Sequence, residues 1–283
     1  MEPIERTFDS ADGSPLPVRL WRPLVPRAAL LYLHGIQSHS GWYAASSRRL
    51  AEAGVAVYQL ERRGSGADSA HQRGHVDRAE TWLGDVAAAA EVVRGETGFP
   101  TVHLAGVSWG GKLALAAAAH RPHLYRSLVL ASPGIFPKID AVLIMKLRVV
   151  KALVAGRPLT RFPIPLADPH LFTENPDRVR YIAADPLSLR QVTARFMFES
   201  RRLDRLARRA ARAVRTPTFL ALAALDRIID NHATRALVQR MPADCKRVVQ
   251  YPGAHHTLEF EPDPEPFFRD LVAWIDRVQA AAG

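Results

Sequence analysis

The strongest constraint on the fold of this chain is the alternation of short apolar runs with segments of helical periodicity. Short strands that alternate with helices of about ten residues or more are typical of βαβ units and of a mostly parallel sheet. The predicted strands comprise residues 4–9, 16–22, 28–33, 55–60, 101–107, 127–131, 218–224 and 246–251. The predicted helices comprise residues 43–53, 78–94, 109–120, 233–240 and 264–279. We therefore predict an α/β fold with an opening hairpin, a mostly parallel sheet of about eight strands and helices on both faces.

One long segment interrupts this alternation. No clear strand run occurs from about residue 134 to residue 215, and helix-like segments dominate there. About eighty residues between two strands of one sheet are too many for an ordinary loop. We therefore predict a core made of residues 1–133 and 216–283 and a helical cap, or lid, made of residues 134–215.

The positive charge of the chain is concentrated in the same region. The net charge is +10; residues 141–215 hold 16 basic and 6 acidic residues, and the rest of the chain holds 22 of each. A neutral body with one basic segment does not favour nucleic-acid binding, and no nucleic-acid partner is expected. Two interpretations stay open for the arginine-rich stretch 201–215: a solvated helix face, or peripheral contact with an anionic substrate or membrane.

Residues 140–154 form a second notable stretch within the predicted cap. When they are projected at 100° per residue, the three basic side chains do not gather on one face, and most of the circumference is apolar. Such a helix packs into the core, lines a pocket for an acyl chain, or rests on a membrane.

The expected location is the cytoplasm. The chain has one cysteine, Cys245, which fits a reducing compartment. Its start lacks the basic and apolar regions of a signal peptide, and no run approaches about 18 apolar residues, so no spanning helix is expected. No oligomeric state is predicted from the sequence.

The strongest local motif is a Gly-x-Ser-x-Gly pattern centred on Ser108. The serine follows an apolar strand run and opens a predicted helix, where a tight turn keeps its hydroxyl exposed. Gly106 and Gly110 allow the close backbone approach that such a turn needs. This context favours Ser108 as a nucleophile.

A nucleophilic serine requires a base and an acid that orients it. In α/β-hydrolases these follow the serine along the chain, acid first, each in a loop after a strand. Asp226 follows the strand 218–224 directly, whereas Asp230 precedes a predicted helix and is a candidate N-cap. The strand 246–251 is followed by two adjacent histidines, His255 and His256, and position alone does not choose between them.

The oxyanion of an acyl-transfer reaction needs two backbone N–H donors. Trp109, at the start of the helix after Ser108, supplies one candidate, because the first N–H groups of a helix lack intrahelical acceptors. The turn His34-Gly35-Ile36 after strand 28–33 supplies the other, with Ile36 as the donor. Gly35 permits the turn, and His34 is expected to support it through a hydrogen bond.

These motifs together resemble the α/β-hydrolases of the monoacylglycerol lipase and lysophospholipase group, also classed with the serine aminopeptidase-like S33 hydrolases. The matching segments are His34-Gly35 with residues 38–43, residues 63–69, Arg73-Gly74-His75, Asp85, the turn around Ser108, Asp226 and residues 253–256. The resemblance implies an α/β-hydrolase fold. It also implies His256 as the catalytic base, three residues after Gly253, with Ser108 as nucleophile and Asp226 as acid. The chain departs from the group at Ala223, Glu61 and Trp109, where glycine, aspartate and often methionine are usual.

The predicted function is therefore that of a serine carboxylic-ester hydrolase acting on a small ester or lipid, with no metal or organic cofactor. A proline iminopeptidase-like peptidase shares the three residues, but it needs acidic residues in the cap to hold a free amine, and this cap is basic. An acyltransferase, or a cofactor-free peroxidase, would also keep them. A non-catalytic binding protein on this fold usually lacks the serine or the histidine. Dehalogenases and epoxide hydrolases of this fold use an aspartate nucleophile, so Ser108 argues against them.

Overall fold

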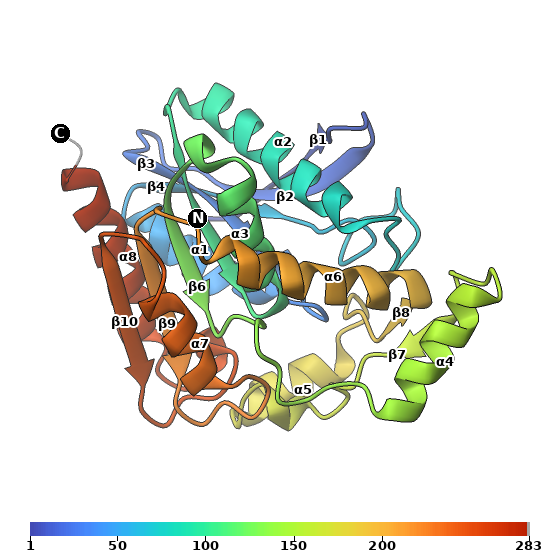
Figure 1. Ribbon diagram of the computed structural model, residues 1–283. Coiled ribbons are helices and arrows are strands. Elements are labelled where there is room, and N and C mark those ends of the chain that lie inside the picture. The colour runs from blue at the N-terminus through green and yellow to red at the C-terminus, as the bar shows by residue number, and fades with distance from the viewer. Residues whose placement is uncertain (282–283) are drawn as a thin grey trace.

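A mixed eight-stranded sheet lies at the centre of the computed structural model, which describes residues 1–281 (Figure 1). In order across the sheet, the strands are β1 (Ile4–Asp9), β2 (Pro15–Trp21), β4 (Val55–Leu60), β3 (Ala28–Leu33), β5 (Val102–Val107), β6 (Tyr125–Ala131), β9 (Thr218–Ala223) and β10 (Lys246–Tyr251). β2 pairs antiparallel with β1 and β4, and all other neighbours are parallel. The predicted fold class is thus confirmed. Residues 282 and 283, the end of the predicted core segment 216–283, lie outside the described residues.

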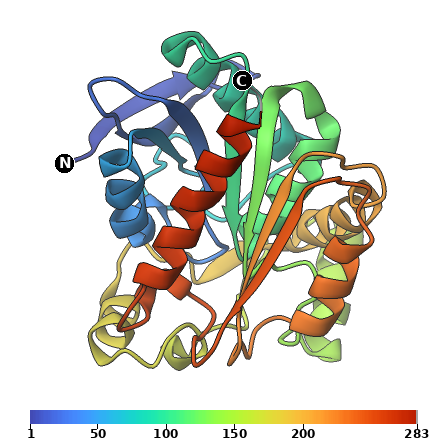
Figure 2. The ribbon, with the colours of Figure 1, turned by 90° about the vertical axis from the view of Figure 1, so that its left-hand side faces the viewer.

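Helices cover both faces of this sheet. α1 (Ala44–Glu52) and α8 (Glu265–Ala280) lie on one face, and α2 (Ala79–Thr97) and α3 (Trp109–His120) on the other (Figure 2). Every residue of β3, β4, β5 and β9 is buried, as expected for parallel strands covered on both sides. The remaining elements of the core are α7 (Asn231–Gln239) and the short 3₁₀ helices η1 (Ser40–Tyr43), η2 (Pro122–Leu124) and η4 (Leu258–Phe260).

The segment between β6 and β9, which we call the insertion (residues 132–217), contains helices and a small second sheet. Its elements are α4 (Leu143–Val154), β7 (Arg161–Pro163), η3 (Pro169–Leu171), α5 (Pro176–Ala184), β8 (Gln191–Thr193) and α6 (Ala194–Ala210). β7 and β8 pair antiparallel, so the prediction of an insertion without strands is wrong. Each of these strands has three residues, which is too short for an alternating pattern to show in the sequence.

Helix α4, which covers most of the apolar stretch 140–154, lies at the outer edge of the molecule (Figure 1). Val149 is buried, whereas Leu143, Ile144, Leu147, Val150 and Val154 are between 55% and 85% exposed. Packing into the core is therefore the wrong interpretation for this helix. Within residues 1–281, none of the helices combines the length and the apolar character that crossing a membrane requires.

The carboxyl ends of the parallel strands meet at one edge of the sheet, which is where ligands bind in open α/β folds. β3 ends at Leu33, directly before His34, and β5 ends at Val107, directly before Ser108. The loops that carry Asp226 and His256 follow β9 and β10 at the same edge. Topology alone thus brings the predicted site residues together.

Asp230 caps a helix, as its position in the sequence predicts. Its side chain accepts a hydrogen bond from the N–H of Ala233, at 2.9 Å, at the start of α7. We expect Asp230→Ala to lower the free energy of unfolding by about 0.5–2 kcal/mol, measured by urea denaturation, with kcat unchanged. Asp244→Ala, at an exposed residue in the next loop, is the control and should change it by less than about 0.5 kcal/mol. Equal stability of the two variants would contradict the capping role.

Candidate active site

Ser108 stands in a strained turn between β5 and α3. Its backbone angles are φ 52° and ψ −120°, a conformation that costs a non-glycine residue free energy and is concentrated at functional sites. The turn is held by its own carbonyl, which accepts hydrogen bonds from the N–H groups of Gly111, at 2.9 Å, and Gly134, at 2.7 Å. The hydroxyl is thereby fixed at the strand-end edge of the sheet.

The two glycines of the motif are needed because the backbone packs tightly around this turn. A Cβ on Gly106 would overlap the carbonyl of Gly110 and come within 2.8 Å of the Cα of Gly111. A Cβ on Gly110 would overlap the carbonyls of Leu33 and His34. The predicted requirement for glycine at both positions therefore has a steric cause, and it brings β3 and its following loop against the start of α3.

A chain of hydrogen bonds joins the three residues predicted for catalysis. Ser108 Oγ lies 2.8 Å from His256 Nε2, and His256 Nδ1 lies 2.7 Å from Asp226 Oδ2. The histidine and the aspartate are 1% and 4% exposed. With Nδ1 donating to the carboxylate, Nε2 is free to accept the serine proton.

Asp226 is held as a carboxylate. Its other oxygen, Oδ1, accepts hydrogen bonds from the N–H groups of Ile228, at 2.8 Å, and Ile229, at 3.1 Å. Burial by itself raises the pKa of this carboxyl, but the charge and hydrogen bond of His256 and these two amides outweigh it, and the pKa lies below its ordinary value of 3.8. The structure thus brings Asp226, and not Asp230, to the histidine.

The two adjacent histidines point to different partners. His255 lies against Glu261, to which its backbone N–H donates at 3.0 Å and its ring at 3.4 Å. His256 points to Ser108, and the ring of Phe172, from the insertion, packs edge-on against it with centroids 5.9 Å apart. Of the two histidines between which position alone did not choose, His256 is therefore the one within hydrogen-bond distance of Ser108.

The turn His34-Gly35-Ile36 lies against the serine turn. Ile36 and Trp109, whose amides are the predicted oxyanion donors, line the same cavity as Ser108. The His34 ring donates from Nδ1 to the carbonyl of Gly35, at 2.8 Å, and accepts at Nε2 from the N–H of Arg62, at 3.0 Å. Burial, and then the nearby charge of Arg62, lower the pKa of His34 well below 6.5, so the ring is neutral and can accept at Nε2.

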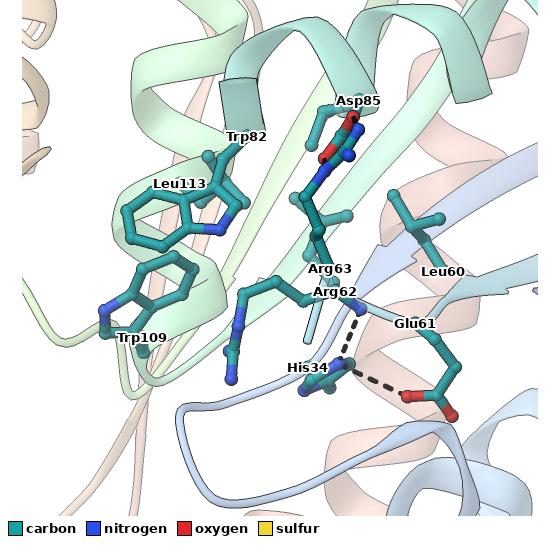
Figure 3. Close-up of a pocket in the computed structure, with 11 residues that line it drawn as sticks. His34, Leu60, Glu61, Arg62, Arg63, Trp82, Asp85, Trp109 and Leu113 are labelled. Carbon is teal, nitrogen blue, oxygen red and sulfur yellow. Dashed lines mark hydrogen bonds and ion pairs between the residues drawn. The ribbon is translucent and has the colours of Figure 1, made fainter. Parts of the chain in front are cut away.

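The sequence analysis missed Arg62, which is 5% exposed and lies beside Trp109 (Figure 3). Its guanidinium carbon is 4.6 Å from the centre of the indole ring. The available signal was its place two residues after the end of β4, at the same edge of the sheet as Ser108.

A cavity of about 400 Å³ opens next to Ser108. Its apolar wall comes mostly from the insertion and includes Ile139, Val149, Ile164, Leu166, Phe196 and Met197. A site of this size, mostly apolar with a few polar groups, is typical of small-molecule binding.

A row of charged side chains also borders this cavity. Lys112 pairs with Asp204 at 2.5 Å, Asp204 with Arg201 at 3.4 Å, Arg201 with Asp140, and Asp140 with Lys146 at 2.6 Å. The row runs from α3 across α6 to α4. Burial lowers the pKa of Lys112, which Asp204 only partly offsets. In the sequence, Lys112 could have been noticed as the one lysine within the otherwise apolar helix α3.

Within residues 1–281, no group of three or more His, Cys, Asp or Glu side chains is arranged to hold a metal ion. The hydrogen-bonded serine, histidine and aspartate have the arrangement that nucleophilic acyl transfer requires.

Comparison with known proteins relates the chain to a family of hydrolases. The family Hydrolase_4, described as serine aminopeptidase, S33, matches residues 25–263. The monoglyceride lipase of Homo sapiens is 28% identical over 280 residues, covering 97% of this chain and 91% of the relative. The monoacylglycerol lipase of Mycolicibacterium smegmatis is 26% identical over 280 residues, covering 96% of each chain. The crystal structure of Paleococcus ferrophilus monoacylglycerol lipase matches with a TM-score of 0.79 at 25% identity, covering 98% of this chain and 100% of that one.

The family match spans most of the chain, and the relatives align in sequence over almost its whole length. The solved structure shares the arrangement of sheet and helices over 98% of the chain. The chain therefore belongs to the serine aminopeptidase S33 family (Hydrolase_4) of α/β-hydrolases, in the group that includes the monoacylglycerol lipases, and it is an esterase-type serine hydrolase.

Proposed function

We propose that the protein hydrolyses carboxylic esters with apolar acyl chains, monoacylglycerols among them, through an acyl-enzyme on Ser108. One observation carries the proposal. Ser108, His256 and Asp226 are joined by hydrogen bonds, and Ser108 lines a largely apolar cavity. The names of the relatives point to the same class of small lipid ester.

The proposed reaction has two halves. His256 Nε2 takes the hydroxyl proton while Ser108 Oγ attacks the ester carbonyl, and the N–H groups of Ile36 and Trp109 donate to the resulting oxyanion. The intermediate collapses, the C–O bond to the alcohol breaks, and the alcohol leaves with the proton from His256. A water then gives a proton to His256 and attacks the acyl carbon. The bond between the acyl carbon and Ser108 Oγ breaks, His256 returns the proton to Oγ, and the acid leaves. Asp226 stabilises the imidazolium in both halves, and the reaction as written requires no cofactor.

An aminopeptidase activity is the second candidate, because the matched family is described by it. Such an enzyme needs an acidic group free to bind the amino terminus of its substrate. Two acids border the cavity, Asp140 and Asp204, and both are paired with cations of the charged row. This pairing favours an ester without a free amine. Higher activity on amino-acid arylamides than on esters would favour the aminopeptidase over the esterase. Transfer of the acyl group to an added alcohol would identify an acyltransferase.

The assignment of the three catalytic residues can be tested by substitution. We expect Ser108→Ala and His256→Ala to lower kcat on p-nitrophenyl butyrate by about 10⁴-fold or more, because such residues act as a unit. Asp226→Asn should lower it by orders of magnitude through the wrong histidine tautomer. His255→Ala is the matched control and should keep most activity. A fluorophosphonate probe should label the wild type but not Ser108→Ala; loss of activity in His255→Ala with retention in His256→Ala would refute the assignment.

The cavity makes a prediction about acyl chains. Burial of apolar surface stabilises the bound chain by about 0.8 kcal/mol per CH₂. We therefore expect kcat/KM for p-nitrophenyl esters to rise several-fold for each two added carbons until the cavity is full. Met197→Trp, which enlarges a side chain of the wall, should shift the optimum to shorter chains. A flat profile from acetate to octanoate would count against the acyl-binding role.

The proposal includes peripheral contact of the insertion with an anionic membrane. α4 presents its exposed leucines together with the exposed cations Arg148 and Lys151. In α6, by contrast, Arg208 donates to the carbonyl of Ile135 at 2.9 Å and lies over the ring of Phe136, so part of the arginine-rich stretch is structural. We take α4 as the principal contact. The cytoplasmic location, supported by the free Cys245, is part of the same proposal.

Vesicle binding distinguishes this contact from an ordinary solvated surface. Each cation close to an anionic bilayer contributes about 1 kcal/mol, so Arg148→Gln/Lys151→Gln should weaken binding to phosphatidylserine vesicles at least tenfold and reduce its dependence on salt. Arg121→Gln/Arg240→Gln removes the same charge at the opposite edge of the sheet, where α3 and α7 end, and should bind as the wild type does. Equal binding by both double variants, or no binding by the wild type at low salt, would refute the contact.

A further inference from the structure

Arg62 is a buried cation whose charge the mechanism has not yet used. Its guanidinium donates from Nη1 to the carbonyl of Gly35, at 2.9 Å, and from Nη2 to the carbonyl of Ile36, at 2.8 Å, and to the hydroxyl of Ser65. All three acceptors are neutral. Glu61, the adjacent acid, points away from the guanidinium of Arg62 and lies 3.5 Å from His34 Nε2 (Figure 3). Its other carboxylate oxygen accepts a hydrogen bond from the N–H of Ser40, at 3.0 Å. Burying a cation without a carboxylate partner is costly, so this arrangement needs an explanation.

The two carbonyls that Arg62 holds belong to the turn that carries the predicted oxyanion donor. A trans peptide is planar, so its C=O and the next N–H point in opposite directions. Fixing the carbonyl of Gly35 toward Arg62 therefore directs the N–H of Ile36 the other way, and Ile36 and Ser108 line one cavity. A Cβ built on Gly35 would lie 3.4 Å from the Cβ of Ser108, so this turn and the nucleophile are in close contact.

Arg62 also contacts the second donor residue. Its guanidinium lies 4.6 Å from the centre of the Trp109 ring and 5.6 Å from that of Phe196. Trp109 begins α3, and its own indole N–H donates to Ser200 at 2.8 Å, which fixes the ring between Arg62 and the insertion. One side chain thus touches both residues whose amides face the oxyanion.

We propose that Arg62 is the positioning residue of the oxyanion hole. The guanidinium N–H groups hold the turn at Gly35 and Ile36, and the face of the guanidinium packs on the ring of Trp109. The backbone N–H groups of Ile36 and Trp109 thereby keep the spacing that the tetrahedral intermediate needs. The inference rests on the proposed function of Ser108. Arg62 does not touch the substrate itself. Its planar fork suits this task, because a lysine ammonium cannot donate to both carbonyls in one fixed plane.

The neighbouring Arg63 provides a matched control. It is also buried and follows the same strand, but it points away from Arg62 and pairs with Asp85 of α2 at 2.6 Å (Figure 3). Arg63→Gln removes an equal charge and an equal number of donors, and it should lower stability without moving the oxyanion donors.

The experiment measures kcat, KM and the Ki of an alkyl trifluoromethyl ketone, whose hemiketal oxyanion occupies the hole. All values are referred to active sites titrated with a fluorophosphonate. We expect Arg62→Gln to lower kcat about 10- to 100-fold and to raise Ki by a similar factor, less than the ~10²–10³-fold effect of losing an oxyanion donor. KM should change less than about threefold. Arg62→Lys should resemble Arg62→Gln, and Arg63→Gln should keep kcat and Ki within about threefold of the wild type.

Three results would overturn the proposal: unchanged kcat and Ki in Arg62→Gln, wild-type kcat in Arg62→Lys, or equal losses in Arg62→Gln and Arg63→Gln. If Arg62→Gln does not fold, Arg62→Lys, which keeps the charge, decides. Calorimetry measures ketone binding without turnover. A wild type that binds the ketone but does not hydrolyse esters would therefore contradict the proposed function and leave the role of Arg62 to be judged from binding alone.

Discussion

A serine with φ 52° and ψ −120° stands between β5 and α3 because the backbone around it approaches more closely than side chains would allow. Gly106 and Gly110 have no Cβ atoms, and a Cβ at either position would push the serine turn away from β3 and from the start of α3. Ser108, the turn at Gly35 and the first amide of α3 are consequently held in direct contact. The histidine and the acid need only come from the ends of β10 and β9, which the parallel order of the sheet already places at that edge.

Two buried cations converge on the residue that follows the serine. Arg62 lies 4.6 Å and Lys112 5.4 Å from the centre of the Trp109 ring, and Lys112 is anchored by Asp204 of α6. A cation over the face of a desolvated indole is worth up to about 2 kcal/mol. This geometry explains why a bulky aromatic occupies a position where the related group often carries methionine: a thioether offers no such face to a cation. The start of α3 thereby contacts the loop after β4 through Arg62 and the insertion through Lys112 and Asp204.

The sheet and the place of the candidate site could be predicted because they follow from local patterns. Apolar runs of five to seven residues mark buried strands, and the residues after them reach one edge, where Ser108 and Asp226 lie on either side of His256. The choice between His255 and His256 needed either a family resemblance or the position of Glu261, which holds His255. β7 and β8 were missed because three-residue strands are stabilised by a distant partner and not by their own sequence. Arg62 was missed because its role depends on carbonyls that lie far from it in the chain.

Helix α4 is attached to the rest of the molecule by few buried contacts. Val149 is the one side chain of this helix that is buried within the described structure, and it belongs to a small cluster with Phe162 and Ala194 that is separate from the main core. Elements with few buried contacts open at a free energy far below that of global unfolding. Amide protons of α4 should therefore exchange with solvent through local opening of the helix. Those of β5 and α3 should exchange more slowly, because they require unfolding of the core. Because Lys146, Val149 and Val150 of α4 line the cavity beside Ser108, local opening of this helix would widen the cavity without moving β5 or α3.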